Sequence, residues 1–447
     1  MKILFPACPF NKVIGDLSIS YTRMIKRLLQ EYRVNEKFKQ VLTLLSVNVI
    51  AIPLSIISSI IITRFLGASA YGDFKYLASL FNLSIILLNL GIFQAANRAL
   101  VLTNDRTKAR ELYGAALTLL GLLFLVISIA LFFYAMFDRN IQEKGLQSTL
   151  MWTIPVAWIF LLSRYFEVLL QADNKISLLA KSRLYPKIAF FTTILILYLI
   201  FFNYSGNRLH IIWMLFLGTE MVGYIYILLR IYPSFKNLKN RINEIWHYNK
   251  AYGFNVYLGS IFSTGFSALT GILISYFGID NSGVGFYALA LTIAGPLEFI
   301  PNVIATTHYK DFSSRRGIPR KLLLITVGFT LLALGGIWAL VSPFINFFYG
   351  IEFRPVIALT FITSLGVVFT GMADFFNRFL GAHGQGKALR NSAFIVGLGI
   401  MVLNITLIPS FGETGAAYVK VCSGLLYLIL MLIYYRKLSL SLKNSNV

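Results

Sequence analysis

Charged residues are scarce in this chain of 447 residues. Asp, Glu, Lys and Arg make up 13% of it, whereas ordinary soluble domains carry about 25%. Hydrophobic residues make up 57% of the chain and aromatic residues 15%. This composition excludes a water-soluble globule of this size.

Cysteine is nearly absent as well. Cys8 and Cys422 are the two cysteines and lie far apart in the chain, so there is no basis for a disulfide framework or a cysteine zinc knuckle. The four histidines lack the HExxH spacing of a zinc enzyme, so no metal site is predicted. The 40 basic residues outnumber the 18 acidic ones, but they are scattered between apolar runs. A nucleic-acid partner, which needs one basic face, is therefore not expected.

One glycine-rich segment resembles a nucleotide site without completing it. Residues 381–387 match the first seven positions of the phosphate-binding loop GxxxxGK. Ala388 follows, where a Ser or Thr would ligate magnesium, and the segment follows an apolar run instead of a strand. No nucleotide cofactor is expected.

Long apolar runs dominate the rest of the chain. A helix needs about 20 apolar residues to cross the hydrocarbon core of a membrane. By that measure the sequence predicts an all-α polytopic membrane protein with about twelve transmembrane helices. The predicted spans are 41–63, 76–97, 112–137, 148–170, 188–203, 210–229, 254–277, 285–306, 322–344, 355–380, 392–409 and 415–435. The turns between spans 5 and 6 and between spans 11 and 12 are very short, so a count of eleven stays open.

The basic residues predict the orientation of these spans, because cationic loops resist translocation. With both termini in the cytoplasm, 31 of the 40 Lys and Arg residues lie in cytoplasmic segments and six lie outside. The six are Arg64, Lys75, Arg139, Lys144, Arg208 and Arg354. We therefore expect a multi-pass protein of the cytoplasmic (inner) membrane with both termini cytoplasmic.

The first 40 residues form a segment of their own. Met1 to Phe10 is apolar, but two prolines interrupt it and no cleavage site follows, so it is not interpreted as a targeting signal. In residues 17–32, apolar side chains recur at helical spacing and basic ones occupy the other face. This pattern indicates an amphipathic helix on the anionic inner leaflet. A solvated helix packed on the cytoplasmic loops is the alternative.

The chain contains an internal repeat. Gly72 in Tyr71-Gly72-Asp73-Phe74 and Gly285 in Val284-Gly285-Phe286-Tyr287 lie 213 positions apart, and Arg164 and Arg378 lie 214 apart. Two six-helix halves in the same orientation, related by a pseudo-two-fold axis along the membrane normal, are the construction of a transporter. The predicted segments are a cytoplasmic N-terminal segment, a first bundle, a basic cytoplasmic linker, a second bundle and a cytoplasmic tail, at residues 1–40, 41–230, 231–253, 254–435 and 436–447.

Several short motifs point to one family. They are Arg64-Phe65-Leu66-Gly67 with Tyr71-Gly72, Asn89-Leu90-Gly91 followed by Arg98, residues 380–387, and residues 404–409 followed by Gly412 and residues 415–417. In their order and spacing the sequence resembles the polysaccharide flippase (Wzx-like) branch of the multidrug/oligosaccharidyl-lipid/polysaccharide exporter superfamily (MATE/MOP), over about residues 40 to 435. Asn89 departs from the family, whose members often carry an acidic residue there.

This resemblance implies a flippase and not an enzyme. The substrate would be a polyprenyl-pyrophosphate-linked oligosaccharide, moved by alternating access from the cytoplasmic to the outer face in O-antigen, capsule or exopolysaccharide biosynthesis. The implied partners are the lipid-linked oligosaccharide, the membrane lipids, and the polymerase and chain-length proteins of the same pathway. An oligosaccharide needs a wet path, because moving each hydroxyl into hydrocarbon costs about 4–8 kcal/mol.

Two spans carry an acid and an arginine on one helix face. Arg164 and Glu167 are three residues apart, and Asp374 and Arg378 are four apart. Ionisable residues within a span usually face the interior. The planar fork of arginine suits a pyrophosphate, so we expect both arginines to bind it. The alternative is that each acid and arginine neutralise one another near the headgroups.

Further charged residues are candidates for binding or coupling. Lys420 either lines the lumen or extends to the interface, and Arg98 either contacts the substrate or anchors its span. Glu298, between two prolines, and Glu220 are expected to take up a proton or a sodium ion, with Glu167 and Asp374 as further candidates. A buried carboxyl group with a structural role is the alternative.

Two other functions compete with the flippase. A cation-coupled multidrug antiporter of the same superfamily would need a lumen lined by carboxylates, and the arginines within the spans argue against it. A membrane-embedded polysaccharide polymerase or glycosyltransferase would need a sizeable external loop with catalytic residues, whereas the longest predicted outside loops have about ten residues. No catalytic residues are predicted.

Overall fold

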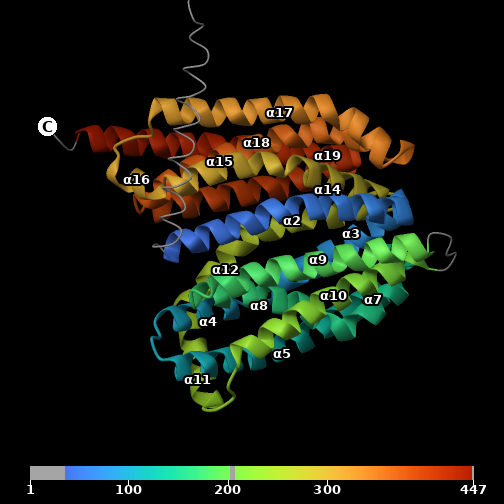
Figure 1. Ribbon diagram of the computed structural model, residues 1–447, viewed down its shortest axis with the longest axis horizontal. Helices are drawn as coiled ribbons and strands as arrows, with labels where there is room; N and C mark the ends of the chain where they lie inside the picture. The colour runs from blue at the N-terminus through green and yellow to red at the C-terminus, as the bar shows by residue number, and fades with distance from the viewer. Residues whose placement is uncertain (1–35, 202–206, 445–447) are drawn as a thin grey trace, which may run out of the picture.

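The computed structural model describes residues 36–201 and 207–444 (Figure 1). The amphipathic helix predicted at residues 17–32 lies outside the described residues. Within the described ranges all regular secondary structure is helical. This is what a membrane imposes, because a helix satisfies its own backbone hydrogen bonds where no water is present.

The first half of the chain contains the helices up to residue 231. They are α2 (Glu36–Leu66), α3 (Ala68–Leu88), α4 (Ile92–Val101), α5 (Arg106–Phe137), α6 (Arg139–Glu143), α7 (Gln147–Thr153), the 3-10 turn η1 (Ile154–Val156), α8 (Trp158–Ala172), α9 (Ile176–Phe201) and α10 (Arg208–Ile231). Side chains cap several of these helices. Asp105, Asp138 and Asn207 each accept a hydrogen bond from a backbone N–H in the first turn of α5, α6 and α10.

The linker and the second half follow. Their elements are α11 (Leu238–Tyr248), the π-helical segment η2 (Asn249–Gly253), α12 (Phe254–Ser260), the π-helical segment η3 (Ile261–Gly265), α13 (Phe266–Phe277), α14 (Ser282–Ala294), α15 (Pro296–Thr307), α16 (Tyr309–Ser314), α17 (Arg320–Phe348), the 3-10 turn η4 (Ile351–Phe353), α18 (Pro355–Ala382) and α19 (Gly386–Asn444).

The last helix is a hairpin of two arms. Gly412 interrupts it with φ 55° and ψ −133°. A Cβ added to Gly399 would lie 3.0 Å from the side chain of Leu426, although the residues between them would span about 40 Å in a straight helix. The chain therefore reverses at Gly412, and each arm crosses separately.

The described residues supply the twelve crossings that hydropathy predicts. Eight helices are long and apolar enough to cross a membrane, and two bent pairs bring the total to ten. The second arm of α19 and the shorter apolar helix α13, continued by α12, complete the set. The prediction of an all-α polytopic membrane protein is confirmed.

Several predicted boundaries are wrong. Predicted span 2 is two helices, α3 and α4, which meet at an angle of 65°, and predicted span 4 bends by 49° between η1 and α8. Predicted span 5 begins too late, because α9 starts at Ile176 and continues through Pro186. The predicted tail is helical to Asn444 and the predicted linker contains α11, and the division of the chain into these segments stays a prediction.

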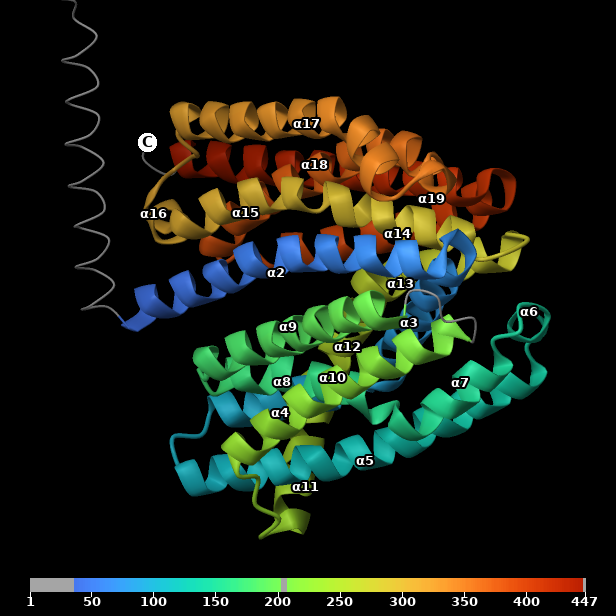
Figure 2. The same ribbon diagram turned by 45° about the vertical axis from the view of Figure 1, so that its right-hand side comes forward.

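The helices run side by side in two layers (Figures 1 and 2). One layer holds α14, α15, α17, α18 and α19, the other holds α5, α8, α9 and α10, and α2 lies between them. We call the end with the α2–α3 and α13–α14 connections the Arg64 end. The opposite end, with α16 and residues 232–253, is the linker end.

The linker is attached to the first half. Arg241 on α11 donates hydrogen bonds to Glu111 (2.8 Å) and to Glu244 (2.9 Å), and Lys108 pairs with Glu244 at 2.8 Å. The backbone N–H of Ser234 donates to the carbonyl of Arg110 at 2.8 Å. Burial raises the pKa of Glu244, but the hydrogen bonds from Lys108 and Arg241 outweigh it and lower that pKa overall.

Candidate functional site

Three cavities between the helices share one lysine, Lys187 on α9. The first, about 360 Å³, lies between α2, α9 and the α14–α15 segment. The second, also about 360 Å³, lies between α2, α8, α9 and α10. The third, about 160 Å³, lies between α2, α3, α9 and α10. We call the first the inter-half cavity and the second the first-half cavity.

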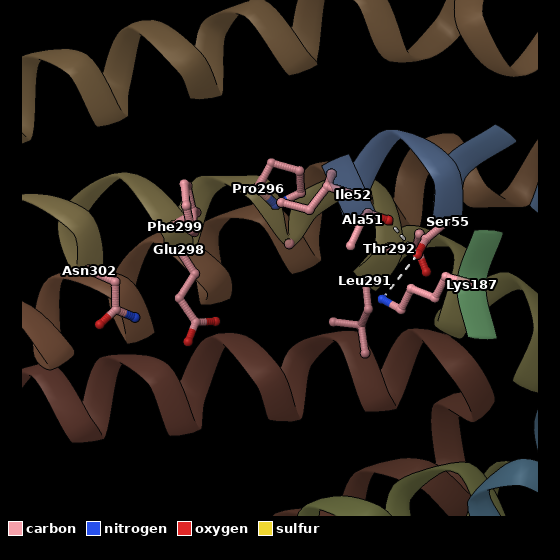
Figure 3. A pocket seen from close by; sticks show the side chains of 11 residues that line it. Ala51, Ile52, Ser55, Lys187, Leu291, Thr292, Pro296, Glu298, Phe299 and Asn302 are labelled. Atoms are coloured by element: carbon pink, nitrogen blue, oxygen red, sulfur yellow. Dashed lines mark hydrogen bonds between the residues drawn. The ribbon is translucent and has the colours of Figure 1, made fainter. Parts of the chain in front are cut away.

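Lys187 stands at one end of the inter-half cavity, and Glu298 and Asn302 on α15 stand at the other (Figure 3). The Lys187 Nζ donates a hydrogen bond of 3.4 Å to Ser55 Oγ on α2. The inter-half cavity thus joins a cation from one half to a carboxyl group and an amide from the other.

Other cations gather near Lys187. Arg183, one turn earlier on α9, lines the first-half cavity with Glu220. Lys75 on α3 lines the third cavity and lies close enough to Lys187 for their charges to repel. The sequence interpretation missed these three cations, because it assigned Lys75 to an outside loop and the other two to a cytoplasmic loop. For Arg183 and Lys187 the sequence did contain a signal, because their spacing of four residues places them on one helix face.

Glu167 connects two arginines. It accepts a hydrogen bond from Arg164 at 2.8 Å and another from Arg183 at 3.0 Å. The predicted proximity of Arg164 and Glu167 is thus confirmed. All three side chains are about two-fifths exposed, so each pair contributes at most about 1 kcal/mol to stability. Arg164 does not line the cavities described above, but it neutralises a carboxylate that does.

Counting charges gives this region a positive balance. Four cations surround the first-half cavity and the adjoining third cavity, namely Lys75, Arg164, Arg183 and Lys187. The two carboxylates there are Glu167 and Glu220. With all six groups ionised, two positive charges have no counter-charge within this group of described residues.

The second half contains a different cluster, between α15, α18 and the second arm of α19. Asp374 accepts a hydrogen bond of 3.0 Å from Tyr427 and a long one of 3.5 Å from Asn302. Glu298 lies next to Asp374, and Lys420 is close enough to attract both carboxyl groups. The sequence interpretation named all three ionisable residues without predicting that they meet.

Two predicted binding residues lie away from these cavities. Arg378 and Arg98 are exposed, and within the described residues neither side chain forms a hydrogen bond or an ion pair. Arg378 lies close enough to Asp374 for their opposite charges to attract. Asn89 is buried at the bend between α3 and α4, where its Oδ1 accepts from the N–H of Gly91 at 3.0 Å. In this chain Asn89 therefore stabilises the backbone bend between α3 and α4.

A fourth cavity, of about 270 Å³, lies in the second half between α13, α18 and the two arms of α19. We call it the second-half cavity. Its hydrogen-bonding and charged lining residues are Ser267, Thr370, Asn377, Lys420, Ser423 and Tyr427, and its apolar side chains are Leu389, Ala393, Val396 and Ile400.

The Arg64 end is closed where α3 and α14 meet. A Cβ added to Gly72 would lie 1.8 Å from the carbonyl oxygen of Asn281, and one added to Gly285 would lie 3.1 Å from the Gly72 backbone. Gly72 and Gly285 are equivalent positions of the repeat. The two halves therefore touch at equivalent glycines, where a larger residue does not fit.

Polar contacts reinforce this closure. Lys144 Nζ donates to Asn281 Oδ1 (3.1 Å) and to Ser275 Oγ (3.0 Å). Asn281 Nδ2 donates to Asp73 at 2.7 Å, and Asn140 Nδ2 donates to Ser275 Oγ at 2.9 Å. Ser275 and Asn281 are fully buried. Each bond joins the first half to the second, so opening this end breaks all of them.

Comparison with solved structures identifies the fold. The lipid II flippase MurJ in an inward closed conformation has a TM-score of 0.69, with 16% identity over 89% of this chain and 89% of that chain. An inward-facing multidrug resistance MATE transporter of the MOP superfamily has a TM-score of 0.66, with 15% identity over 89% and 96%. A Vibrio cholerae MATE transporter has a TM-score of 0.53, with 14% identity over 94% and 98%.

At these identities the likeness shows the fold, which is the predicted arrangement of two six-helix bundles. Among curated proteins none matches the chain. Residues 38–309 match the family model described as polysaccharide biosynthesis protein, which covers more than half of the chain. The predicted resemblance is thereby confirmed: this multi-pass membrane protein belongs to the polysaccharide biosynthesis protein family.

Proposed function

We propose that this protein flips a lipid-linked oligosaccharide across the membrane by alternating access and holds its diphosphate beside Lys187. One observation carries the proposal: Lys187 lines three adjoining cavities, in a group with two uncompensated positive charges. A diphosphate that links a polyprenyl chain to a sugar has one negative charge on each phosphate. The two charges of the ligand would match the two uncompensated charges of the site.

The inter-half cavity supplies the path that such a substrate needs. Ala51, Ile52 and Ser55 on α2 form one side, and the α14–α15 segment forms the other. Hydroxyl groups entering this cavity would meet the side chains of Ser55, Thr292 and Asn302. Such partners offset the cost of taking sugar hydroxyls out of water, which is about 4–8 kcal/mol each without them.

The distribution of basic residues supports an orientation with the linker end in the cytoplasm, in the inner membrane. The Arg64 end then faces outward. With that end closed, the cavities beside Lys187 would receive the substrate from the cytoplasmic side. Release outward requires separating Gly72 from Asn281 and breaking the hydrogen bonds of Lys144.

The predicted arginines have unequal support in this scheme. Arg164 belongs to the positive group and would act by neutralising Glu167, which leaves Lys187 and Arg183 for the phosphates. Arg378 and Arg98 are exposed and away from the cavities, so we propose them as later contacts on the way in or out. Lys420 lines the second-half cavity and is the candidate for contact with the glycan.

Coupling to a proton or sodium gradient is a separate proposal. The membrane potential alone supplies about 2.3 kcal/mol per charge at 100 mV, hence about 4.6 kcal/mol for an outward-moving diphosphate. An ion would instead help the empty carrier to close over Glu298 or Glu220, with Glu167 and Asp374 as further sites. Glu298→Gln should then slow turnover and weaken its gradient dependence in vesicles. Equal gradient dependence in wild type and variant would remove Glu298 from this role.

A vesicle assay tests the proposed function. We expect the reconstituted protein to flip a fluorescent polyprenyl-diphosphate oligosaccharide and Lys187→Met to slow this at least tenfold, because one charge-assisted hydrogen bond contributes about 1.5–3 kcal/mol. Lys181→Met, on the same helix but away from the described cavities, is the matched control. Unchanged flipping by Lys187→Met would contradict the proposal.

The same vesicles separate the flippase from a multidrug antiporter. A group with two uncompensated positive charges repels organic cations, so we expect no cation efflux from the wild-type protein. Efflux of an organic cation that persists in Lys187→Met would favour the antiporter. Partnership with the polymerase and chain-length proteins of the same pathway is proposed by analogy with the family and would be tested by co-purification.

A further inference from the structure

We infer that the second-half cavity is a subsite for an uncharged sugar unit of the translocated substrate. The inference rests on the proposed function and adds to it, because it names the part of the substrate that the second half holds. The cavity is the counterpart of the first-half cavity, and the two differ in the chemistry of their walls.

The two cavities occupy equivalent places in the repeat. Arg183 and Lys187 line the first-half cavity, and Val396 and Ile400, each 213 residues later, line the second-half cavity. The walls of the first come from α2, α8, α9 and α10, and those of the second come from α13, α18 and the two arms of α19. The second-half cavity thus keeps the position but has aliphatic side chains where the first has cations.

The remaining polar lining suits hydroxyl groups better than phosphates. Thr370, Ser423, Asn377 and Tyr427 line the cavity, and each also donates a hydrogen bond within the protein, which leaves its oxygen to accept one from a ligand. A sugar hydroxyl both donates and accepts a hydrogen bond, so it pairs with groups of these types. The aliphatic wall formed by Val396 and its neighbours matches the apolar C–H face of a sugar ring. A site of this size with a few placed polar groups on an apolar wall is typical of small-ligand recognition.

Charge balance argues that the bound unit is uncharged. Lys420 lines the cavity, and within the described residues its Nζ forms no hydrogen bond with protein. Glu298 and Asp374 attract it electrostatically, and Arg378 lies near Asp374. With all four groups ionised, the two carboxylates and two cations of this cluster sum to zero. An ammonium group with free donors in a neutral cluster can bind hydroxyl or carbonyl oxygens, while a further carboxylate would face Glu298 and Asp374.

Hydrogen bonds connect this cavity to the end of the inter-half cavity that lies opposite Lys187. Asn302 and Glu298 stand at the far end of the inter-half cavity from Lys187 (Figure 3). Asn302 donates to Asp374, and Asp374 accepts from Tyr427, which lines the second-half cavity. A substrate with its diphosphate at Lys187 therefore has its glycan directed along these groups toward the second-half cavity.

Binding measurements on the full chain in lipid nanodiscs test this inference. The reference probe is P1-farnesyl-P2-methyl diphosphate, which carries the charge of the natural linkage but no sugar. The test probes replace the methyl group with glucose, N-acetylglucosamine, rhamnose or glucuronic acid. We expect at least one neutral sugar to tighten binding tenfold or more over the methyl probe, and glucuronic acid to bind no more tightly than glucose.

Variants test whether the tighter binding of the neutral-sugar probe arises in the second-half cavity. Ala393→Phe, which fills the cavity, should remove the gain from the sugar and leave the methyl probe within twofold of wild type. Ile395→Phe, on the same arm but exposed outside the cavity lining, is the matched control and should keep the gain. Tyr427→Phe, which adds no bulk, should reduce the gain at least threefold, so the test does not depend on how well Ala393→Phe folds.

The outcomes separate this inference from the proposed function. Lys187→Met should weaken every probe equally, and its failure to do so counts against the diphosphate site alone. No gain from any neutral sugar, or a tenfold preference for glucuronic acid, overturns the uncharged-sugar subsite. Equal weakening of the methyl probe by Ala393→Phe also overturns it, because the occupant would then be the prenyl chain.

Discussion

Arg183 and Lys187 line the first-half cavity, and Val396 and Ile400 line the second-half cavity at the same places of the repeat. With every group ionised, the first group of charges retains two uncompensated positive charges, whereas the cluster of Glu298, Asp374, Lys420 and Arg378 balances to zero. The same helix arrangement thus supports two different electrostatic environments. Repeats fix where cavities lie, and the substituted side chains decide what each one can hold.

The sharpest way to break this comparison is to exchange the equivalent residues. Lys187→Ile should slow flipping at least tenfold, because the site loses a charge-assisted hydrogen bond of about 1.5–3 kcal/mol. Ile400→Lys in the same chain should not restore it, since Glu298 and Asp374 already offset the cations beside the second-half cavity. Vesicle flipping rates of both variants check this. Recovery of flipping in the double variant would mean that a lysine serves equally well in either cavity, which would contradict the comparison.

The two glycines of the closed end should also respond unequally. Gly72→Ala places a Cβ 1.8 Å from a backbone oxygen, while Gly285→Ala meets atoms at 3.0–3.1 Å. Overpacking of this kind costs about 1–3 kcal/mol. We expect Gly72→Ala to shift the protein toward an open Arg64 end and Gly285→Ala to do so less. Labelling of a cysteine at Ser59 from outside measures the shift, and equal labelling in both variants would contradict the ranking.

Substitutions of Arg164 in the first half and Arg378 in the second should also differ in their effect on flipping. Arg164→Ala leaves Glu167 with one partner and lowers the positive balance by one, so we expect roughly a tenfold loss of flipping, consistent with about 1.4 kcal/mol. Arg164→Lys should retain part of the activity, since lysine keeps the charge and loses the fork. Arg378→Ala should have a smaller effect. Flipping rates normalised to protein level check both, and normal flipping by the double alanine variant would make the pair structural.

The smallest expected effect concerns the linker, which is bonded to the first half through Glu111, Lys108 and Arg110. Because the pKa of Glu244 is lowered on folding, its contribution is present above the unfolded value of about 4.5 and is lost as the pH falls through the folded pKa. The protection factors of the α11 amides, which compare observed hydrogen exchange with the intrinsic rate at each pH, should therefore stay high at neutral pH and fall only under acidic conditions. Glu244→Gln should exchange faster at neutral pH, with less change on acidification, and an identical profile would contradict this role.

Much of the fold follows from the sequence because the membrane leaves few alternatives. A charge-free run such as residues 113–137 has to cross, and the repeat between Gly72 and Gly285 fixes how the halves correspond. The errors arise where a helix tolerates a residue that usually ends one. Pro186 lies inside α9, so a boundary placed after it hid the two cations that line the cavities.

The candidate site is harder to predict than the fold. Hydropathy indicates how deep a residue lies in the membrane, but not which side of its helix faces the cavities. Glu298, Asp374 and Lys420 were recognisable as charges within spans, and the structure brings them together. Arg378 and Arg98 have the same appearance in the sequence but are exposed away from the cavities. Which face of a helix meets the lumen depends on its neighbours, and that information comes from packing between distant segments.

The contact between Gly72 and Gly285 has a consequence for the origin of the chain. A two-fold axis brings any point near it against its own copy. In a symmetric dimer of a single six-helix half, this glycine would meet itself, and one substitution would affect both sides of the contact at once. In the fused chain the two positions are encoded separately, so selection can adjust one side of the closure without altering the other.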